Sequence, residues 1–349
     1  MHHERSRYVG GRGYLAACTL GLPADATRDA VRRDLDAWAT GSATAADYSA
    51  SLERSRAHAA SLLGAAPRNV ATGSQVSVFT GLVAASAPRG AEVLCVDGDF
   101  SSVVAPFLAH GGLRVRHVPL DALADAVTAD TAYVSYSLVQ SSTGQIADAA
   151  AIAEAARAAG AFTLVDTTQA TGWMPTDDLD ADLLVCHAYK WLSSPRGAAF
   201  AAFSDRAIEE ITPFTAGWYS GADPWTSCYG PDLHVAPDAT RFDVSPAWNA
   251  WAGAEAALEI AASLDMREVR RHDLSLANSF RAGLGLEASD SAIVSWSDPD
   301  GCDLGAMTAA GITASGRAGR ARAAFHVWND EEDVALALGS LHPHAAFAI

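Results

Sequence analysis

The stretch Phe162–Phe200 reads FTLVDTTQATGWMPTDDLDADLLVCHAYKWLSSPRGAAF, and it decides the fold that the sequence predicts. It contains two apolar runs, Phe162–Val165 and Leu183–Cys186, and each run is followed by polar residues. In an α/β sheet, runs this apolar are strands covered on both faces, and ligands bind at the carboxyl ends of such strands. We therefore expect Asp166, after the first run, and Lys190, after the second, to meet at one edge of the sheet.

A lysine beside a buried carboxylate has a specific chemical use. In a partly desolvated pocket the amine loses some of its preference for the charged form, and a neutral amine can condense with an aldehyde to give a Schiff base. Pyridoxal phosphate is the aldehyde cofactor that uses this reaction, and its ring nitrogen needs an anionic partner. The sequence predicts that Lys190 supplies the amine and that Asp166 keeps the ring nitrogen protonated.

Each residue also has an ordinary structural interpretation. An aspartate at a strand end is often a helix cap or a turn residue, and a lysine after a strand is usually solvated. The functional interpretation is favoured because both residues occur in order with the further elements described below.

The composition predicts a globular protein with one large and one smaller domain. The chain has 349 residues, of which 50% are hydrophobic and 19% charged, which argues against disorder. Its formal net charge of -17 argues against nucleic acid or an anionic membrane as a partner, because both would repel it.

The cysteines and the first residues predict a soluble cytoplasmic protein. The five cysteines form no CxxC pair, so neither a disulfide framework nor a zinc site is indicated, and the odd count fits a reducing compartment. The first residues lack the apolar core of a signal peptide, and no apolar run reaches 18 residues. His2 and His3 could bind a metal, but their place at the terminus favours a leading segment that binds no metal.

A weak phosphate-binding signal precedes these elements in the chain. The segment Asn69–Ala85 reads NVATGSQVSVFTGLVAA, in which a short apolar run leads through Gly73-Ser74-Gln75 into an apolar helix. Free N–H groups and a partial positive charge at a helix start suit a phosphate. Most such sequences are only helix caps.

The order D-x-x-Q, then H-x-Y-K and a turn with Pro and Gly, resembles the class V family of pyridoxal-phosphate enzymes. That family includes cysteine desulfurases, kynureninases, isopenicillin epimerase-like proteins and small aminotransferases. The resemblance implies the type I α/β fold, with a mostly parallel seven-stranded sheet between helices and a small α+β carboxyl-terminal domain. We expect an amino-terminal segment at 1–22, a large domain at 23–245 and a small domain at 246–349, in a homodimer with shared active sites.

The resemblance also implies roles for the central residues. Lys190 would carry the cofactor as a Schiff base, Asp166 would pair with the pyridine nitrogen, and Gln169 would donate to the phenolic oxygen. His187 and Tyr189 would reach the phosphate.

Further roles follow from the same resemblance. Ser74 and Gln75 lie where the family has its phosphate cup, and Phe100 lies where an aromatic residue or a histidine covers the cofactor ring. Phe100 has the alternative of being a core residue. Ser245, before a proline, lies where the family often has a threonine that donates to the other subunit's phosphate. One residue of the loop Ser141–Thr143 would lie over the cofactor, but the register is open.

The segment GRARAAFHVWNDEEDV resembles the family's carboxylate-binding segment, which assigns the substrate carboxylate to Arg322. A guanidinium offers two parallel N–H groups to the two carboxylate oxygens. Arg317 and Arg320 compete for this role, and a solvated surface arginine is the structural alternative.

Periodicity, turn residues and caps predict the remaining elements. The helix at 24–38 should turn Ala26, Ala30, Val31, Leu35 and Trp38 to one side, Asp148 should cap a helix to 159, and Ser245-Pro246 should open a helix to 263. The small domain should contain strands at 292–296 and 322–328, with Asn329 and Glu332 as a capping-box-like pair. The other expected helices are 45–63, 266–284 and 303–310, and the other expected strands are 91–96, 113–118, 132–137 and 197–203, the last antiparallel or at an edge.

The sequence narrows the reaction without naming a substrate. A desulfurase needs a thiolate on a mobile loop before the carboxylate arginine, and Met307–Arg322 has no cysteine, while Cys302 belongs to the preceding turn. We predict an amino-acid-directed enzyme that is most similar to class V aminotransferases, with a lyase acting on C–S or C–C bonds or an epimerase as alternatives. A non-catalytic binding or scaffold protein is a weaker alternative, and a nicotinamide dehydrogenase is disfavoured because no GxGxxG follows an early strand.

Overall fold

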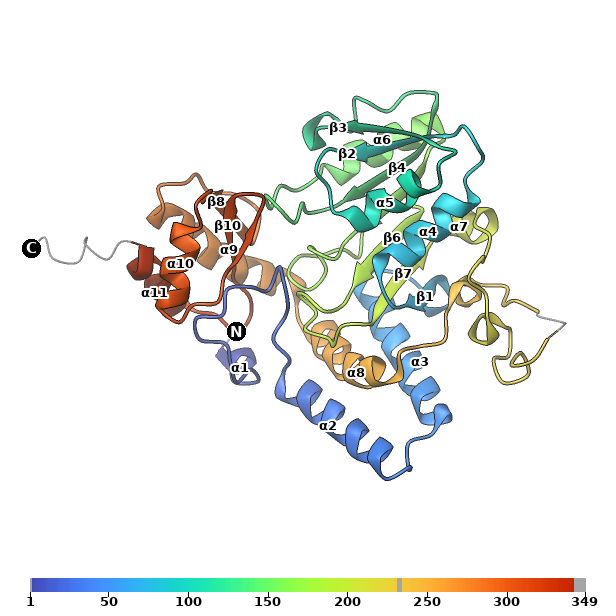
Figure 1. Cartoon of the computed structure of the whole chain (residues 1–349), viewed down its shortest axis with the longest axis horizontal. Helices are drawn as coiled ribbons and strands as arrows, with labels where there is room; N and C mark the ends of the chain where they lie inside the picture. The colour runs from blue at the N-terminus through green and yellow to red at the C-terminus, as the bar shows by residue number, and fades with distance from the viewer. Residues whose placement is uncertain (1, 231–233, 342–349) are drawn as a thin grey trace, which may run out of the picture.

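A seven-stranded sheet forms the centre of the larger part of the chain in the computed structural model, which describes residues 2–230 and 234–341 (Figure 1). The strand order is β1-β7-β6-β5-β4-β2-β3. β7 runs antiparallel to both of its neighbours, and the other pairs are parallel. The expected mostly parallel sheet is therefore confirmed, with β7 inside the sheet. The strands are β1 Val70–Gly73, β2 Glu92–Val96, β3 Arg114–Val118, β4 Thr131–Ser137, β5 Phe162–Asp166, β6 Leu183–His187 and β7 Ala199–Phe203.

Alternating side chains of the central strands enter two separate apolar layers. In β6, Leu183 and Val185 pack in the layer formed with α4 and α5, whereas Leu184 and Cys186 pack in the layer that includes α3, α6 and α8. Because both faces are covered, the strand is apolar from Leu183 to Cys186, as the sequence indicates. The helices that belong with this sheet are α2 Asp25–Ala39, α3 Ala45–Leu62, α4 Val76–Ser86, α5 Ser101–Ala109, α6 Ala149–Ala159, α7 Asp205–Glu210 and α8 Trp248–Ser263. We call the sheet and α2–α8 the large unit.

A three-stranded antiparallel sheet, in the order β8-β10-β9, forms the small unit with three helices. Its elements are α9 Met266–Gly283, β8 Ile293–Ser297, α10 Cys302–Ala309, β9 Ser315–Arg317, β10 Arg320–Ala324 and α11 Glu331–Leu341. The predicted strand at 322–328 is wrong in its bounds, and β9 was not predicted. A three-residue strand joined by a tight turn, with Ala318 and Gly319 at φ 50° and 72°, leaves little periodicity to detect.

The N-terminal segment, residues 2–22, lies beside the small unit and then reaches the large unit (Figure 1). Tyr14 and Ala16 form isolated parallel bridges to Thr313 and Ala324 of the small unit. The segment includes α1 His2–Arg5, although the side chains of His2 and His3 lie outside the described residues. The domain boundaries at 22/23 and 245/246 stay predictions.

Helix α2 does not bury the side that its periodicity indicates. Leu35 and Trp38 are 48% and 66% exposed, whereas Asp34 is buried. The Asp34 carboxylate accepts hydrogen bonds from Tyr48 Oη at 2.6 Å and from Asn249 Nδ2 at 2.6 Å, which turns the polar side of the helix inward. One buried and one part-buried polar bond therefore override the apolar pattern.

Two predicted helix caps are also wrong, and one is confirmed. α8 begins at Trp248 after Ala247, so Ser245 does not cap it; Ser245 precedes a proline, which favours an extended backbone. Asp330 rather than Asn329 caps α11, because Asp330 Oδ1 accepts from the backbone N–H groups of Glu332 and Asp333. Asp148 caps α6 as predicted.

Gly21 brings the N-terminal segment against the backbone of residues 188–198, the connection between β6 and β7 that contains Lys190 and that we call the lysine loop. Its N–H donates to Tyr189 O at 2.9 Å, and a Cβ at this position would lie 2.0 Å from Lys190 O. No side chain fits in that space, so only glycine allows this close approach.

We predict that Gly21→Ala destabilises the protein by about 1–3 kcal/mol, because the added methyl group must displace the Lys190 backbone. Gly81→Ala is the matched control, since nothing lies within 4 Å of a Cβ on that helical residue. The control should be neutral or slightly stabilising. Urea unfolding of both variants measures the difference, and equal stability of the two would contradict the close approach.

Candidate active site

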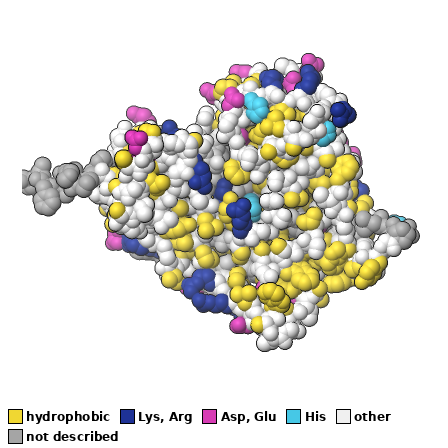
Figure 2. All heavy atoms as spheres, viewed as in Figure 1, with side chains coloured by type: hydrophobic (Ala, Val, Ile, Leu, Met, Phe, Trp, Pro, Cys, Tyr) yellow, Lys and Arg dark blue, Asp and Glu magenta, His cyan; other side chains and the backbone are white. Residues whose placement is uncertain are grey.

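A pocket lies at the carboxyl ends of β4, β5 and β6, where the sequence places the candidate residues. Asp166 ends β5 and pairs with Ser137 at the end of β4, while His187 ends β6. Figure 2 shows side chains of Lys or Arg and of His gathered in the hollow between the small and large units. The lining residues are Val76, Phe100, Ser102, Ser137, Ser141, Asp166, Thr168, Gln169, His187, Tyr189 and Lys190.

Lys190 is buried in this pocket and is 6% exposed. Burial lowers the pKa of its amine from 10.5 to about 8, and the Asp166 carboxylate opposes part of that shift. The amine is thus partly neutral near physiological pH, as condensation with a carbonyl requires. Lys190 is moreover the one lysine of the sequence, a signal that sequence reasoning missed. Every other fixed cationic side chain is an arginine, which remains protonated.

Asp166 faces Lys190 from the end of the neighbouring strand. Burial raises the pKa of its carboxyl from 3.8 to about 6, while hydrogen bonds from Thr168 and the charge of Lys190 lower it. The Thr168 N–H donates to Asp166 Oδ1 at 2.8 Å. At neutral pH the group is therefore mainly a carboxylate, and it lies where a cationic ligand nitrogen would be stabilised.

The amide of Gln169 is held at both ends. Its Nε2 donates to Cys18 O at 2.8 Å, and its Oε1 accepts from Trp191 Nε1 at 2.9 Å. The indole N–H can only donate, so it fixes which end of the amide is oxygen. The amide nitrogen has two hydrogens, and the second remains for a ligand in the pocket.

His187 has a buried ring nitrogen, Nε2, with no hydrogen-bond partner among the described residues. Burial, followed by the charges of Arg196 and Lys190, lowers the pKa of its imidazole to about 4, so the ring is neutral at pH 7. Its ring packs edge-on against Tyr189 with centroids 4.4 Å apart. A buried polar atom without a partner is rare, and here it marks a place for a ligand.

Arg196 is a residue that sequence reasoning missed. Its guanidinium lies over the Tyr189 ring, 5.0 Å from the centroid, and its charge acts on His187. In the sequence, the turn after Lys190 that contains it is distinguished by its Pro and Gly residues. This position adds positive charge beside the predicted phosphate contacts.

Phe100 lies over the pocket and is 44% exposed, so the alternative of a core residue is wrong. Lys190 Nζ lies 5.3 Å from the centroid of its ring. Asp99 holds this loop, because its Oδ2 accepts from the Ser137 N–H at 2.8 Å and from Gln140 Nε2 at 3.1 Å. The ring is therefore placed to cover a flat ligand between itself and the strand ends.

Ser74, Gln75 and Ser245 do not line this pocket, although Val76, next to the first two, does. Gln75 and Ser245 are exposed. The phosphate contacts expected of these three residues stay predictions.

Arg322 stands directly behind the pocket wall and is 1% exposed. Its guanidinium donates to Ser141 O, to Thr19 Oγ1 at 3.0 Å and to Ser315 Oγ at 3.1 Å, while its Nε has no partner among the described residues. Because Ser141 lines the pocket, it is the residue of the loop Ser141–Thr143 that reaches the site.

The two competing arginines are less well placed. Arg320 donates to Ser295 Oγ and to Ser295 O, both at 2.9 Å, and is committed to the small sheet. Arg317 is exposed and donates to the carbonyl of Gly316 beside it. Of the three candidates, Arg322 therefore has the closest connection to the pocket.

The side chains in the pocket fit pyridoxal phosphate. A partly neutral buried amine faces a buried carboxylate across the strand ends, an aromatic ring covers the space between them, and an unpartnered imidazole nitrogen lies beside an arginine. These groups match an aldehyde, a ring nitrogen, a flat ring and a phosphate respectively.

Comparison with known proteins identifies relatives of this chain. Residues 37–309 match the family model described as Aminotransferase class-V. Kynureninase from Deinococcus radiodurans is 32% identical over 70% of this chain and 62% of its own length. Isopenicillin N epimerase from Amycolatopsis lactamdurans is 32% identical over 47% of this chain and 46% of its own length. The chain thus matches less than two thirds of the length of these relatives.

Solved structures with low sequence identity share the fold. The cysteine desulfurase CsdA from Escherichia coli has a TM-score of 0.83 at 18% identity, covering 98% of this chain and 97% of its own. The cystine C-S lyase C-DES, in complex with its product cysteine persulfide, has a TM-score of 0.86 at 20% identity, covering 95% of this chain and 98% of its own. The expected type I fold is therefore confirmed. The match over residues 37–309, which is most of the chain, shows that the chain belongs to the class-V aminotransferase family.

Proposed function

We propose that this protein is a pyridoxal-phosphate-dependent enzyme that acts on an amino acid and is most similar in reaction to class V aminotransferases. The observation that carries the proposal is the buried Lys190 amine, with its pKa lowered to about 8, opposite the buried Asp166 carboxylate. When bound, pyridoxal phosphate supplies a ring that accepts the electrons of a bond broken at the substrate's α-carbon.

The chain's own residues hold and orient the cofactor in this proposal. Lys190 attaches it covalently, and Asp166 keeps a proton on the ring nitrogen. Gln169 donates its free amide N–H to the phenolic oxygen. The neutral His187 and Tyr189 contact the phosphate, and Arg196 adds charge to that end of the site.

Lys190 also moves the proton at the α-carbon, since Phe100 cannot. Phe100 covers one face of the pocket with an aromatic ring, which has no titratable group. Lys190 Nζ lies 5.3 Å from the centroid of that ring. An amine with a pKa near 8 is well matched to proton transfer at neutral pH.

Arg322 binds the substrate carboxylate in this proposal. Its unpartnered Nε and its bond to Ser141 in the pocket wall support the assignment. Two of its present acceptors are the hydroxyls of Thr19 and Ser315, which can rotate to keep a bond as a carboxylate approaches.

A lyase or an epimerase remains the alternative reaction. The relatives named kynureninase and isopenicillin N epimerase, and the solved C-S lyase, support keeping both. Against a persulfide-forming desulfurase, Cys302 lies on α10 of the small unit, and Met307–Arg322 contains no cysteine.

The protein forms a homodimer in this proposal, with each active site completed by the other subunit. Leu35 and Trp38 expose the apolar side of α2, and Trp248 on α8 stacks on Tyr48 with ring centroids 4.9 Å apart. Figure 2 shows hydrophobic side chains gathered over this lower part of the molecule. Ser245, just before α8, would then contact the partner's phosphate.

The net charge and the odd cysteine count support a cytoplasmic protein without a nucleic-acid partner. In residues 2–230 and 234–341, none of the helices has the length and the apolar character of a membrane span.

The Lys190 amine should react with an amine-selective acylating reagent with a midpoint at about pH 8 instead of 10.5 in the cofactor-free protein. Reactivity rises with pH because only the neutral amine is a nucleophile. Asp166→Asn should lower the midpoint further, since the carboxylate stabilises the ammonium form. Peptide mass spectrometry measures the reaction without interference from other lysines. A midpoint near 10.5 would show a solvated amine.

Added pyridoxal phosphate should give a visible absorbance band that Lys190→Ala and Lys190→Arg both lack. The arginine variant retains the charge but cannot condense with the aldehyde, so it separates attachment from electrostatic binding. A panel of amino acids should then change the spectrum and yield keto acid, ammonia or sulfide. If the band forms but no amino acid changes it, the non-catalytic binding protein is favoured.

Trp38→Glu should weaken self-association about 30-fold, because losing a central tryptophan from an interface costs about 2 kcal/mol or more. Leu336→Glu, a change at an exposed residue of α11, is the control and should leave association unchanged. Sedimentation at several concentrations gives both values. A wild-type chain that stays monomeric would end the dimer proposal.

A further inference from the structure

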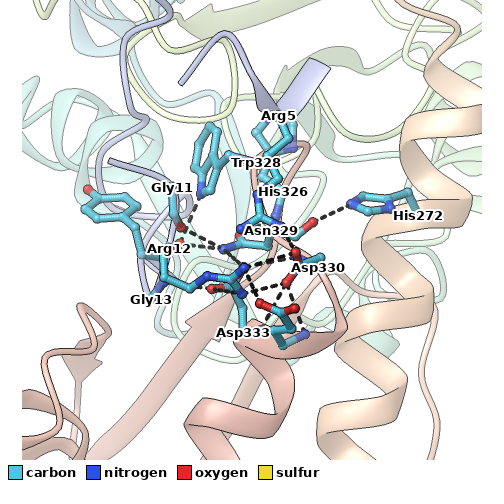
Figure 3. Close-up of polar contacts among 12 residues, drawn as sticks. Arg5, Gly11, Arg12, Gly13, His272, His326, Trp328, Asn329, Asp330 and Asp333 are labelled. Carbon is cyan, nitrogen blue, oxygen red and sulfur yellow. Dashed lines mark hydrogen bonds and ion pairs between the residues drawn. The ribbon is translucent and has the colours of Figure 1, made fainter. Parts of the chain in front are cut away.

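His326 is a buried histidine that has no role in the proposed chemistry. It lies two residues beyond β10, the strand that contains Arg322, and is 2% exposed. Figure 3 shows it beside Trp328 and Asn329, in the polar cluster where Asn329 contacts Gly11 of the N-terminal segment. A buried imidazole needs partners for both nitrogens.

Both nitrogens have partners, and they come from different units. Nδ1 lies 2.9 Å from Asp273 Oδ2 on α9, and Nε2 lies 2.9 Å from Trp191 O, next to the active-site lysine. The ring also packs edge-to-face against Trp191 and Trp328, with centroids 5.2 Å and 4.8 Å away. One side chain therefore joins the small unit to the lysine loop.

The partners fix the protons. Trp191 O can only accept, so Nε2 carries a hydrogen. A second proton lies between Nδ1 and Asp273, because two unprotonated groups 2.9 Å apart would repel each other. Whichever of the two groups holds this second proton, the pair has no net charge, which its burial favours. The hydrogen on Nε2 is thus always directed at Trp191.

Trp191 passes this constraint on to the pocket. Its carbonyl is fixed by His326, and its indole N–H fixes Gln169 Oε1. The lysine loop, which contains both Lys190 and Trp191, cannot shift toward solvent without breaking these bonds. Gln169 cannot turn its amide over while the indole holds the oxygen.

We propose that His326, oriented by Asp273, is a positioning residue that fixes Trp191, and through Trp191 holds Lys190 buried and Gln169 with its amide nitrogen toward the cofactor. The role of Gln169 rests on the proposed function, whereas the burial of Lys190 does not. His326 touches neither the cofactor nor the substrate in this scheme.

Two substitutions of His326 separate its two bonds. In His326→Gln, the amide N–H can take the position of Nε2 and donate to Trp191 O. In His326→Asn, the shorter side chain can place its N–H only at the position of Nδ1, toward Asp273. The asparagine variant should raise the Lys190 reactivity midpoint on the order of one pH unit, because a loosened loop admits water to the amine. The glutamine variant should keep the wild-type midpoint. Both measurements use the cofactor-free full chain, so they hold even if pyridoxal phosphate does not bind.

His272→Asn is the matched control, since His272 Nε2 also bonds a backbone carbonyl, Asn329 O, from the same helix as Asp273 (Figure 3). It should lower the unfolding temperature without moving the Lys190 midpoint.

If His326→Asn does not fold, Trp191→Phe tests the contact from Trp191 to Gln169. This variant removes the indole N–H, so the absorbance maximum of the bound cofactor should shift while the Lys190 midpoint stays unchanged. The proposal is overturned if His326→Asn titrates like the wild type, if His272→Asn gives the same shift, or if Trp191→Phe leaves the spectrum unchanged.

Discussion

Burial of one amine beside one carboxylate is the constraint on which the site depends. Lys190 and Asp166 meet because β5 and β6 are neighbouring parallel strands, so their carboxyl ends lie at the same edge of the sheet. Desolvation moves the two pKa values toward each other, to about 8 and about 6. Each charge stabilises the other, which allows both to stay ionisable in an apolar surrounding. A reactive amine and a stable anion in one pocket follow from this geometry.

Segments far apart in the sequence keep that pair in place. The N-terminal segment contributes Gly21, whose N–H bonds the Tyr189 carbonyl, and Cys18, whose carbonyl accepts from Gln169. The small unit contributes Arg322 behind the pocket wall and His326 behind the lysine loop. The pocket is therefore built on the sheet but closed by both ends of the chain, so a change in either end can alter the site without touching a ligand.

The strand ends could be predicted because their signal is local. Apolar runs followed by polar residues locate β5 and β6, and the spacing around Lys190 resembles a known family. The inward side of α2 could not be predicted, because Asp34 is held by Tyr48 on the next helix and by Asn249, which lies 215 residues away. β9 is too short to have a period. His326 gave no signal, since its role depends on partners 53 and 135 residues away.

The most direct test of this account is to reduce the protein with borohydride in the presence of pyridoxal phosphate and to map the modified peptide by mass spectrometry. Lys190 is the one lysine of the chain, so it and the amino terminus are the available primary amines. The account predicts that the reduced cofactor is attached to Lys190 at one equivalent per chain. A label found on the amino terminus alone, or no label, would contradict it.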